Sequence, residues 1–163
     1  MAKSLTDKSV VIIGATGGLG SGFARLFAAK GARLLLAGRN IEKLRVVKDA
    51  IIGDEAIVAS DVTIVTVDVT DSQSVEELTR ISKEWSANID IVINASGTDI
   101  RKSLGDHSPQ DIQNVIDINL MGTILITKAF IPCMRDQKGS TIVSVGGFAD
   151  GRMAFPYYSV DVM

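Results

Sequence analysis

A glycine-rich turn between an apolar run and an amphipathic segment constrains the fold of this chain more than any other feature. Gly14–Gly20 (GATGGLG) follows the β-branched run Ser9–Ile13 and precedes Ser21–Lys30, where apolar side chains recur at helical spacing. A strand that enters a helix through such a turn leaves unpaired N–H groups and partial positive charge at the helix N-terminus, which suits a diphosphate. The spacing is G-x-x-x-G-x-G without a following Lys-Ser/Thr, so the turn is not a P-loop. Taken alone, it could also be a tight connection that binds nothing.

The remainder of the chain repeats this alternation of strand and helix. After Ser9–Ile13, the predicted strands are Arg33–Ala37, Val62–Val67, Ile89–Ile93 and Thr141–Val145. Predicted helices cover Ser21–Lys30, Asn40 to about Ile52, a segment opened by Asp71, and a long segment opened by Ser108-Pro109 that includes Ile112–Met134. Continuous apolarity in the strands is typical of parallel strands covered on both faces. We therefore expect an α/β fold, a doubly wound parallel sheet of the Rossmann type, in a single domain over residues 1–163.

Composition excludes several classes of partner. The 163 residues are 46% hydrophobic, enough for a sizeable core, and the net charge of −2 offers no cationic surface for nucleic acid or an anionic membrane. No apolar run approaches the roughly 20 residues of a membrane-spanning helix. Cys133 is the only cysteine, which excludes an internal disulfide and favours a reducing, cytoplasmic location. His107, the only histidine, cannot form a metal site alone and is expected to be a solvated loop residue rather than a substrate contact.

The end of the second predicted strand indicates which dinucleotide the chain prefers. The sequence there is Ala37-Gly38-Arg39-Asn40, without the acidic residue that would bond a ribose 2′-hydroxyl. Arg39 offers a planar guanidinium suited to a phosphate group. These residues favour NADP(H) over NAD(H), and the alternative for Arg39 is an ordinary surface arginine before a helix.

Several motifs in one order resemble the short-chain dehydrogenase/reductase family. Gly14, Gly18 and Gly20 match its T-G-x-x-x-G-x-G, although Ile13 replaces the threonine. Asp68-Val69 stands at the end of the third strand, and Asn94-Ala95-Ser96-Gly97 is similar to the family's N-N-A-G. The sequence Ile118-Asn119-Leu120-Met121-Gly122 contains the expected asparagine. The resemblance covers residues 8 to about 145.

The resemblance implies hydride transfer between a nicotinamide and a small carbonyl or secondary alcohol. It implies that the dinucleotide is bound by Gly14, Thr16, Gly18, Leu19, Gly20, Arg39, Asn40, Asp68, Val69, Asn94, Ala95 and Gly97. Tyr158 would be the acid–base group, Asn119 a supporting residue and Ser144 the candidate for orienting substrate. The long segment Ile112–Met134 matches the family's oligomer helix, which implies a homodimer or homotetramer.

The resemblance weakens at the catalytic end. Tyr158-Ser159 resembles the start of Y-S-x-x-K, but Val162 stands in place of the lysine, and pairing from Tyr157 puts Asp161 there. Gly146 and Gly147 occupy the family's serine positions, so Ser144 could substitute only after a shift in strand register. Two functions follow as alternatives: an NADP(H)-dependent oxidoreductase, or a non-catalytic dinucleotide-binding protein that acts as a sensor, regulator or interaction partner.

We also expect further sheet strands beyond this sequence. Members of the family continue well past the tyrosine motif, and without a further strand Thr141–Val145 would be an exposed apolar edge.

Overall fold

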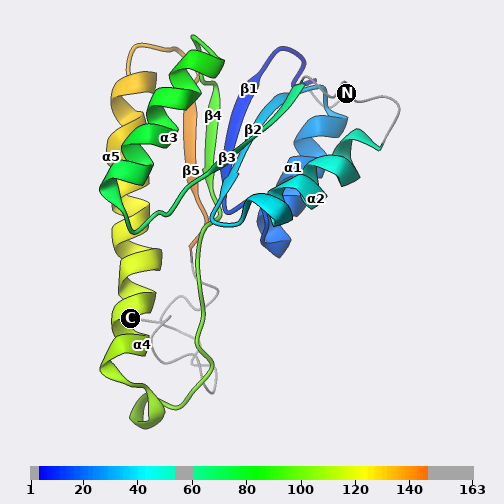
Figure 1. The fold of residues 1–163 in the computed structure, drawn as a ribbon. Coiled ribbons are helices and arrows are strands. Elements are labelled where there is room, and N and C mark those ends of the chain that lie inside the picture. The colour runs from blue at the N-terminus through cyan, green and yellow to red at the C-terminus, as the bar shows by residue number, and fades with distance from the viewer. Residues whose placement is uncertain (1–3, 54–60, 147–163) are drawn as a thin grey trace.

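A computed structural model of the chain describes residues 4–53 and 61–146, which form one five-stranded sheet with helices on both faces (Figure 1). The strands are β1 (Ser9–Ile13), β2 (Arg33–Gly38), β3 (Val62–Thr66), β4 (Ile91–Asn94) and β5 (Thr141–Ser144). The helical segments are α1 (Gly18–Ala29), α2 (Ile41–Ile52), α3 (Ser72–Trp85), η2 (Leu104–Asp106), α4 (Pro109–Val115), η3 (Ile116–Met121) and α5 (Gly122–Met134).

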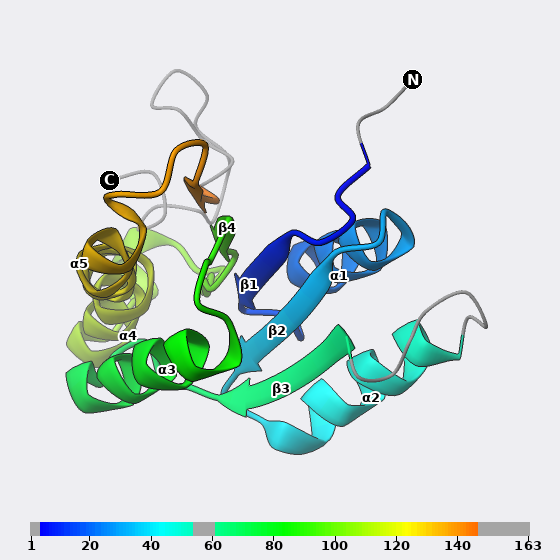
Figure 2. The same ribbon diagram turned by 90° about the horizontal axis from the view of Figure 1, so that it is seen from above.

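All neighbouring strands are parallel and their order is β3-β2-β1-β4-β5. The helices α1 and α2 cover one face of the sheet, while α3 and α5 cover the other, as the view from above shows (Figure 2). This arrangement confirms the predicted doubly wound Rossmann fold. The chain reverses its direction of winding between β1 and β4, and ligands of such sheets bind at this point, beyond the carboxyl ends of the strands. That edge is the lower one in Figure 1.

Adjacent residues of each central strand serve two separate cores. Val11 and Leu35 pack with side chains of α3 and α5, among them Phe130, whereas Ile12 and Leu36 pack with those of α1 and α2. This division follows from the two-residue repeat of a strand, which sends successive side chains to opposite faces. Burial on both faces explains why the strands are continuously apolar in sequence.

Polar side chains cap the helices where the sequence predicts it. The Asn40 side chain accepts the Lys43 N–H at 2.9 Å and opens α2, and Asp71 accepts the Gln73 N–H at 2.9 Å at the start of α3. Helix α1 differs from the prediction, because it begins at Gly18 and not at Ser21. Two of the turn glycines therefore lie inside the helix, where their low helix propensity had suggested a loop.

The long helical segment Pro109–Met134 corrects one expectation from the sequence. Its 26 residues are long and apolar enough to cross a membrane by length and composition alone, whereas no run was expected to approach that limit. Core helices of soluble proteins meet the same criterion, and here Ile126, Phe130 and Met134 are buried against the sheet. A six-residue π-helical segment, η3, interrupts the segment between α4 and α5.

The strand β5 forms an edge of the sheet within the described residues, as predicted. Its only described neighbour is β4, and three of its four residues are exposed. Val143 keeps 39% of its surface accessible.

Candidate functional site

A cleft opens at the carboxyl edge of the sheet, where β1, β2, β3 and β4 end. Its volume is about 140 Å³. Its lining residues come from the turns that follow these four strands and from η3: Ile13, Gly14, Thr16, Gly17, Gly38, Arg39, Val67, Asp68, Val69, Ala95, Ser96, Gly97 and Ile118. The cleft therefore lies at the point where the direction of winding reverses, which is the expected place for a ligand.

The turn between β1 and α1 forms one wall of the cleft. Gly14 has a φ of +76°, and a Cβ placed on it would lie 2.5 Å from the carbonyl oxygen of Ala95. A Cβ on Gly20 would overlap the backbone of Gly14, so the first turn of α1 packs directly on the loop. By contrast, no atom lies within 4 Å of a Cβ placed on Gly18. Two glycines thus permit close packing of backbone, and the third leaves open space at the start of the helix.

The N-terminus of α1 offers backbone N–H groups without a competing side chain. The N-cap residue is Gly17, which has no side chain to cap the helix, and the first turn of the helix holds no acidic residue. The N–H groups of Gly18, Leu19 and Gly20 have no partner within the helix at these positions. Together with the helix dipole, these groups suit an anionic ligand.

Replacing Gly14 by alanine should destabilise the fold by about 3 kcal/mol. The added methyl group meets the Ala95 backbone and also forces a side chain into left-handed backbone geometry. Chemical denaturation of the variant measures this loss. Gly139, with a φ of +85° but open space around its Cβ position, is the matched control: Gly139→Ala should lose only the smaller conformational part. Equal losses in the two variants would contradict a role for close packing at Gly14.

Arg39 and Asp68 stand at the far side of the cleft, after β2 and β3. Arg39 is exposed and lines the cleft beside Gly38. The Asp68 carboxylate accepts two hydrogen bonds from Thr70, at 2.9 Å from its N–H and 2.7 Å from its hydroxyl. These two bonds, with a smaller contribution from the charge of Arg39, lower the pKa of Asp68 below its ordinary value. The carboxylate is therefore ionised at neutral pH and its geometry is fixed, so it can accept a hydrogen bond from a ligand.

Asn94 stabilises the turn after β4 through hydrogen bonds and does not line the cleft. It is 1% exposed. Its Nδ2 donates to the Thr123 hydroxyl at 3.0 Å, and its Oδ1 accepts the N–H of Ser96 at 3.1 Å and the Ser96 hydroxyl at 2.5 Å. Because both its amide nitrogen and its amide oxygen are hydrogen-bonded within the chain, the Asn94 side chain shapes the turn that carries Ala95 and Gly97.

Asn119 holds the next part of the same loop. Its Oδ1 accepts the N–H of Thr98, and its Nδ2 donates to the carbonyl oxygen of Thr98, both at 2.9 Å. The side chain projects from η3, and π-helical turns of this kind are frequent at functional sites. The Thr123 hydroxyl donates to the Asn119 carbonyl at 2.8 Å and so links the asparagine to the Asn94 network.

A second cavity, of about 350 Å³, adjoins the cleft beside Asp68. Its lining residues are Arg39, Asp68, Thr70, Thr98, Ile100, Asn114, Asp117 and Ile118. Among them, only Arg39 and Asp68 are dinucleotide-binding residues predicted from the sequence. Thr70 could have been found from its position two residues after Asp68, a spacing typical of an Asx turn. For Thr98, Ile100 and Asn114 no local signal exists, because they meet only in the folded chain.

The structure brings together some of the predicted dinucleotide residues and separates others. Those that line the cleft are Gly14, Thr16, Arg39, Asp68, Val69, Ala95 and Gly97. Gly18 and Leu19 lie in the first turn of α1, Gly20 packs beneath it, Asn40 caps α2 and Asn94 is buried. These five residues are absent from the lining of the cleft.

The predicted catalytic residues are only partly described. Ser144 ends β5 in register with Asn94, and it is exposed. Paired residues of parallel strands point to the same face, so the Ser144 side chain lies on the α5 side of the sheet. Tyr158 lies outside the described residues. Within residues 4–53 and 61–146, no group of three or more His, Cys, Asp or Glu side chains could hold a metal ion.

Comparisons with known proteins agree with this architecture. The family model described as short chain dehydrogenase matches residues 8–160. An uncharacterised oxidoreductase of Staphylococcus aureus (strain USA300) is 35% identical over 147 residues, which are 88% of this chain and 61% of that protein. Dehydrogenase/reductase SDR family member 7B of Mus musculus is 30% identical over 155 residues, which are 95% of this chain and 48% of that protein.

Solved structures give the same result. The alcohol dehydrogenase from the archaeon Thermococcus sibiricus, solved in complex with 5-hydroxy-NADP, superposes with a TM-score of 0.83 at 27% identity. The match covers 95% of this chain and 64% of that structure. The chain thus spans about 61% of the length of the curated oxidoreductase that it matches.

Proposed function

The chain belongs to the short-chain dehydrogenase family. From this premise we propose that it is an NADP(H)-dependent oxidoreductase acting on a small carbonyl compound or a secondary alcohol. The observation that carries the proposal is the uncapped N-terminus of α1, which lies beside a cleft with Asp68 and Arg39 on its far side. Backbone amides at a helix N-terminus and a guanidinium suit the phosphate groups of a phosphorylated dinucleotide, and an ionised carboxylate accepts hydrogen bonds from its hydroxyl or amino groups.

Each part of the dinucleotide has a complementary group in the chain. The amides of Gly18, Leu19 and Gly20 would hold the diphosphate, because they lie at the positive end of the helix dipole. Asp68 would accept a hydrogen bond from the adenine amino group, and the Arg39 guanidinium would pair with a 2′-phosphate. The nicotinamide, when bound, supplies or accepts the hydride.

The proposed acid–base group is Tyr158. A phenol titrates near pH ~10, so it exchanges protons poorly at neutral pH without a neighbouring cation. Asn119 would support the site indirectly, because its side chain holds the backbone of Thr98. Ser144 lies at the same edge of the sheet and is the proposed substrate-orienting hydroxyl.

A second candidate function is favoured by two departures from the family's catalytic motifs. Val162 stands where the family has the lysine that activates the tyrosine, and Gly146 and Gly147 stand at the serine positions. In this alternative the chain binds the dinucleotide without turnover and acts as a sensor, regulator or interaction partner. For either function we propose a single dinucleotide-binding domain. The single Cys133 supports a cytoplasmic location, and the match of Ile112–Met134 to the family's oligomer helix supports a homodimer or homotetramer.

Replacing Arg39 by alanine should reduce NADPH affinity by about 10- to 100-fold and leave NADH affinity unchanged, since one charged hydrogen-bonding partner is lost. Fluorescence titration of the two reduced dinucleotides measures both constants. Arg45→Ala is the matched control, because Arg45 pairs with Glu42 on the exposed side of α2 and does not line the cleft. Equal affinities for NADPH and NADH in the unmodified chain would contradict the preference for NADP(H).

A further inference from the structure

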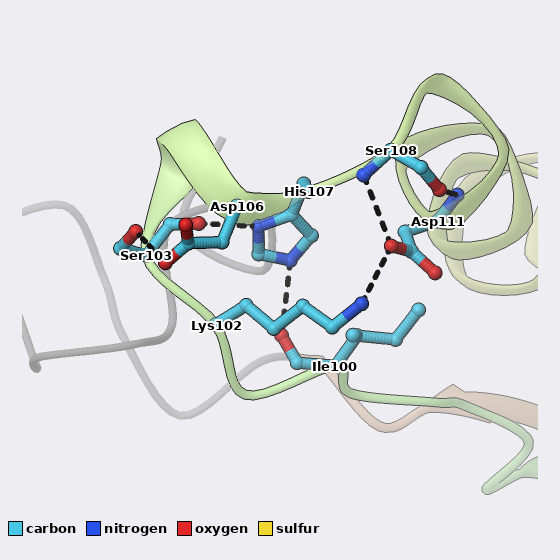
Figure 3. A network of polar contacts seen from close by, with 7 residues as sticks. All are labelled: Ile100, Lys102, Ser103, Asp106, His107, Ser108 and Asp111. Carbon is cyan, nitrogen blue, oxygen red and sulfur yellow. Dashed lines mark hydrogen bonds and ion pairs between the residues drawn. The ribbon is translucent and has the colours of Figure 1, made fainter.

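His107 is buried, although its place in a polar loop predicts a solvated side chain. Only 9% of its surface is accessible. It follows the short helix η2 in the segment that joins β4 to α4, and its ring points back toward the start of that segment (Figure 3). Its Nδ1 lies 2.9 Å from the carbonyl oxygen of Ser103, and its Nε2 lies 3.0 Å from the carbonyl oxygen of Ile100.

Both ring nitrogens therefore face hydrogen-bond acceptors. A carbonyl oxygen cannot donate, so each contact is a hydrogen bond only if the ring nitrogen carries a hydrogen. Neutral imidazole has one N–H group and imidazolium has two. The two contacts are consequently hydrogen bonds at the same time only when the ring is doubly protonated, and the neutral ring leaves one lone pair facing a carbonyl oxygen.

The same two carbonyl groups also close backbone turns. The Ile100 oxygen accepts the N–H of Lys102, and the Ser103 oxygen accepts the N–H of Asp106, both at 3.0 Å. A carbonyl oxygen has two lone pairs and accommodates both donors. The ring thus joins two successive turns of the loop.

Three charged side chains belong to the same network of polar contacts: Asp106 on η2, Lys102 in the loop and Asp111 on α4 (Figure 3). The hydrogen bond from Lys102, together with the backbone and side chain of Ser108, lowers the pKa of Asp111 to about 2. Asp111 is therefore ionised throughout the neutral range.

The loop that His107 holds is a wall of the candidate site. Ile100 and Thr98 line the cavity beside Asp68 and Arg39. Asn119 anchors this wall at Thr98, and His107 anchors it at Ile100. Without the second anchor, the segment from Ile100 to Asp106 would keep the ion pair of Lys102 with Asp111 but would lose the contacts that tie Ile100 to Ser103 through the ring.

We propose that His107 is a positioning residue whose doubly protonated ring holds the carbonyl groups of Ile100 and Ser103 together and so fixes the wall of the cavity that adjoins the dinucleotide cleft. The wall loosens as the ring loses a proton. The idea that this wall contacts a dinucleotide rests on the proposed function. The pair of hydrogen bonds from the ring to Ile100 and Ser103, called the clip below, does not rest on it.

Amide hydrogen exchange of the ligand-free chain tests the clip. Protection of the Lys102 and Asp106 amides, taken relative to the unstructured chain at each pH, should fall about tenfold between about pH 5.5 and about pH 8. In His107→Gln the protection should be low at both pH values. Lys102→Met is the matched control, because it removes the ion pair with Asp111 and keeps the ring, so its loop should still change with pH.

Unchanged protection in the unmodified chain, or the same pH profile in His107→Gln, would overturn the proposal.

A second measurement needs no variant. Because His107 is the only histidine, its ring signals in nitrogen-15 spectra of the tag-free protein need no assignment. Two slowly exchanging ring N–H protons are expected at about pH 5.5, and fewer than two would contradict the clip. A separate NADPH titration of the same sample tests the proposed function, so the two can fail independently.

Discussion

Replacing Gly18 by aspartate is expected to weaken NADPH binding by about 10³-fold and to raise the stability of the free protein by about 1 kcal/mol. The new carboxylate would stand at the first position of α1, next to the amides proposed to bind the diphosphate. Two like charges about 4 Å apart near a protein surface repel by roughly 4 kcal/mol, which is about three powers of ten in affinity. The same carboxylate favours the helix, because α1 has no acidic residue in its first turn and glycine is a poor helix former.

Two variants isolate the cause. Gly22→Asp adds the same charge one turn further along α1, at a position that is equally open and exposed, and should leave binding nearly unchanged. Gly18→Asn adds nearly the same volume without the charge and should lose much less affinity than the aspartate. Isothermal titration with NADPH and thermal denaturation together give both quantities. NADPH binding of Gly18→Asp at the unmodified affinity would exclude α1 as the diphosphate site.

Replacing Tyr158 by phenylalanine should lower kcat by about 10³-fold if the protein is an oxidoreductase. Positioned acid–base groups contribute about 10²- to 10⁴-fold, and phenylalanine has no proton to exchange. NADPH binding should be unaffected, because the proposed contacts to the dinucleotide come from other residues. Consumption of NADPH with a small carbonyl substrate measures the turnover.

Tyr157→Phe is the control, since it removes the neighbouring phenol and keeps Tyr158. A loss of turnover in Tyr157→Phe alone would reassign the acid–base role to the other tyrosine. Tight NADPH binding without turnover in the unmodified chain would instead favour the non-catalytic alternative. Val162→Lys then provides a further comparison, because it introduces the lysine that the resembled motif has four residues after the tyrosine.

Much of the fold could be predicted from the sequence, because its determinants are local. Strand β1 has the predicted bounds, and α2 begins after Asn40 as expected, because a capping side chain and an apolar repeat act within a few residues. The start of α1 at Gly18 was missed, because glycine favours turns in isolation and only the packing of Gly20 on the Gly14 backbone makes the earlier start favourable.

The site was predicted less completely, because several of its contacts join distant parts of the chain. Asn94 is a cleft residue by resemblance, but the structure buries it against Thr123, which lies 29 positions away. The burial of His107 and the hold of Asn119 on Thr98 depend in the same way on how the loop folds back. Arg39 and Asp68 could be predicted, because Arg39 directly follows β2, Asp68 lies two residues after the end of β3, and the ends of parallel strands meet at one edge.

The hydrogen bonds that shape the cleft have a thermodynamic consequence. Asp68 is fixed by Thr70, the turn after β4 is fixed by Asn94, and Thr98 is fixed by Asn119, each through hydrogen bonds within the chain. A ligand that enters such a preorganised cleft does not have to order these turns, so less conformational entropy is lost on association. The affinity of this cleft should consequently depend on the contacts it makes and only weakly on rearrangement of the protein.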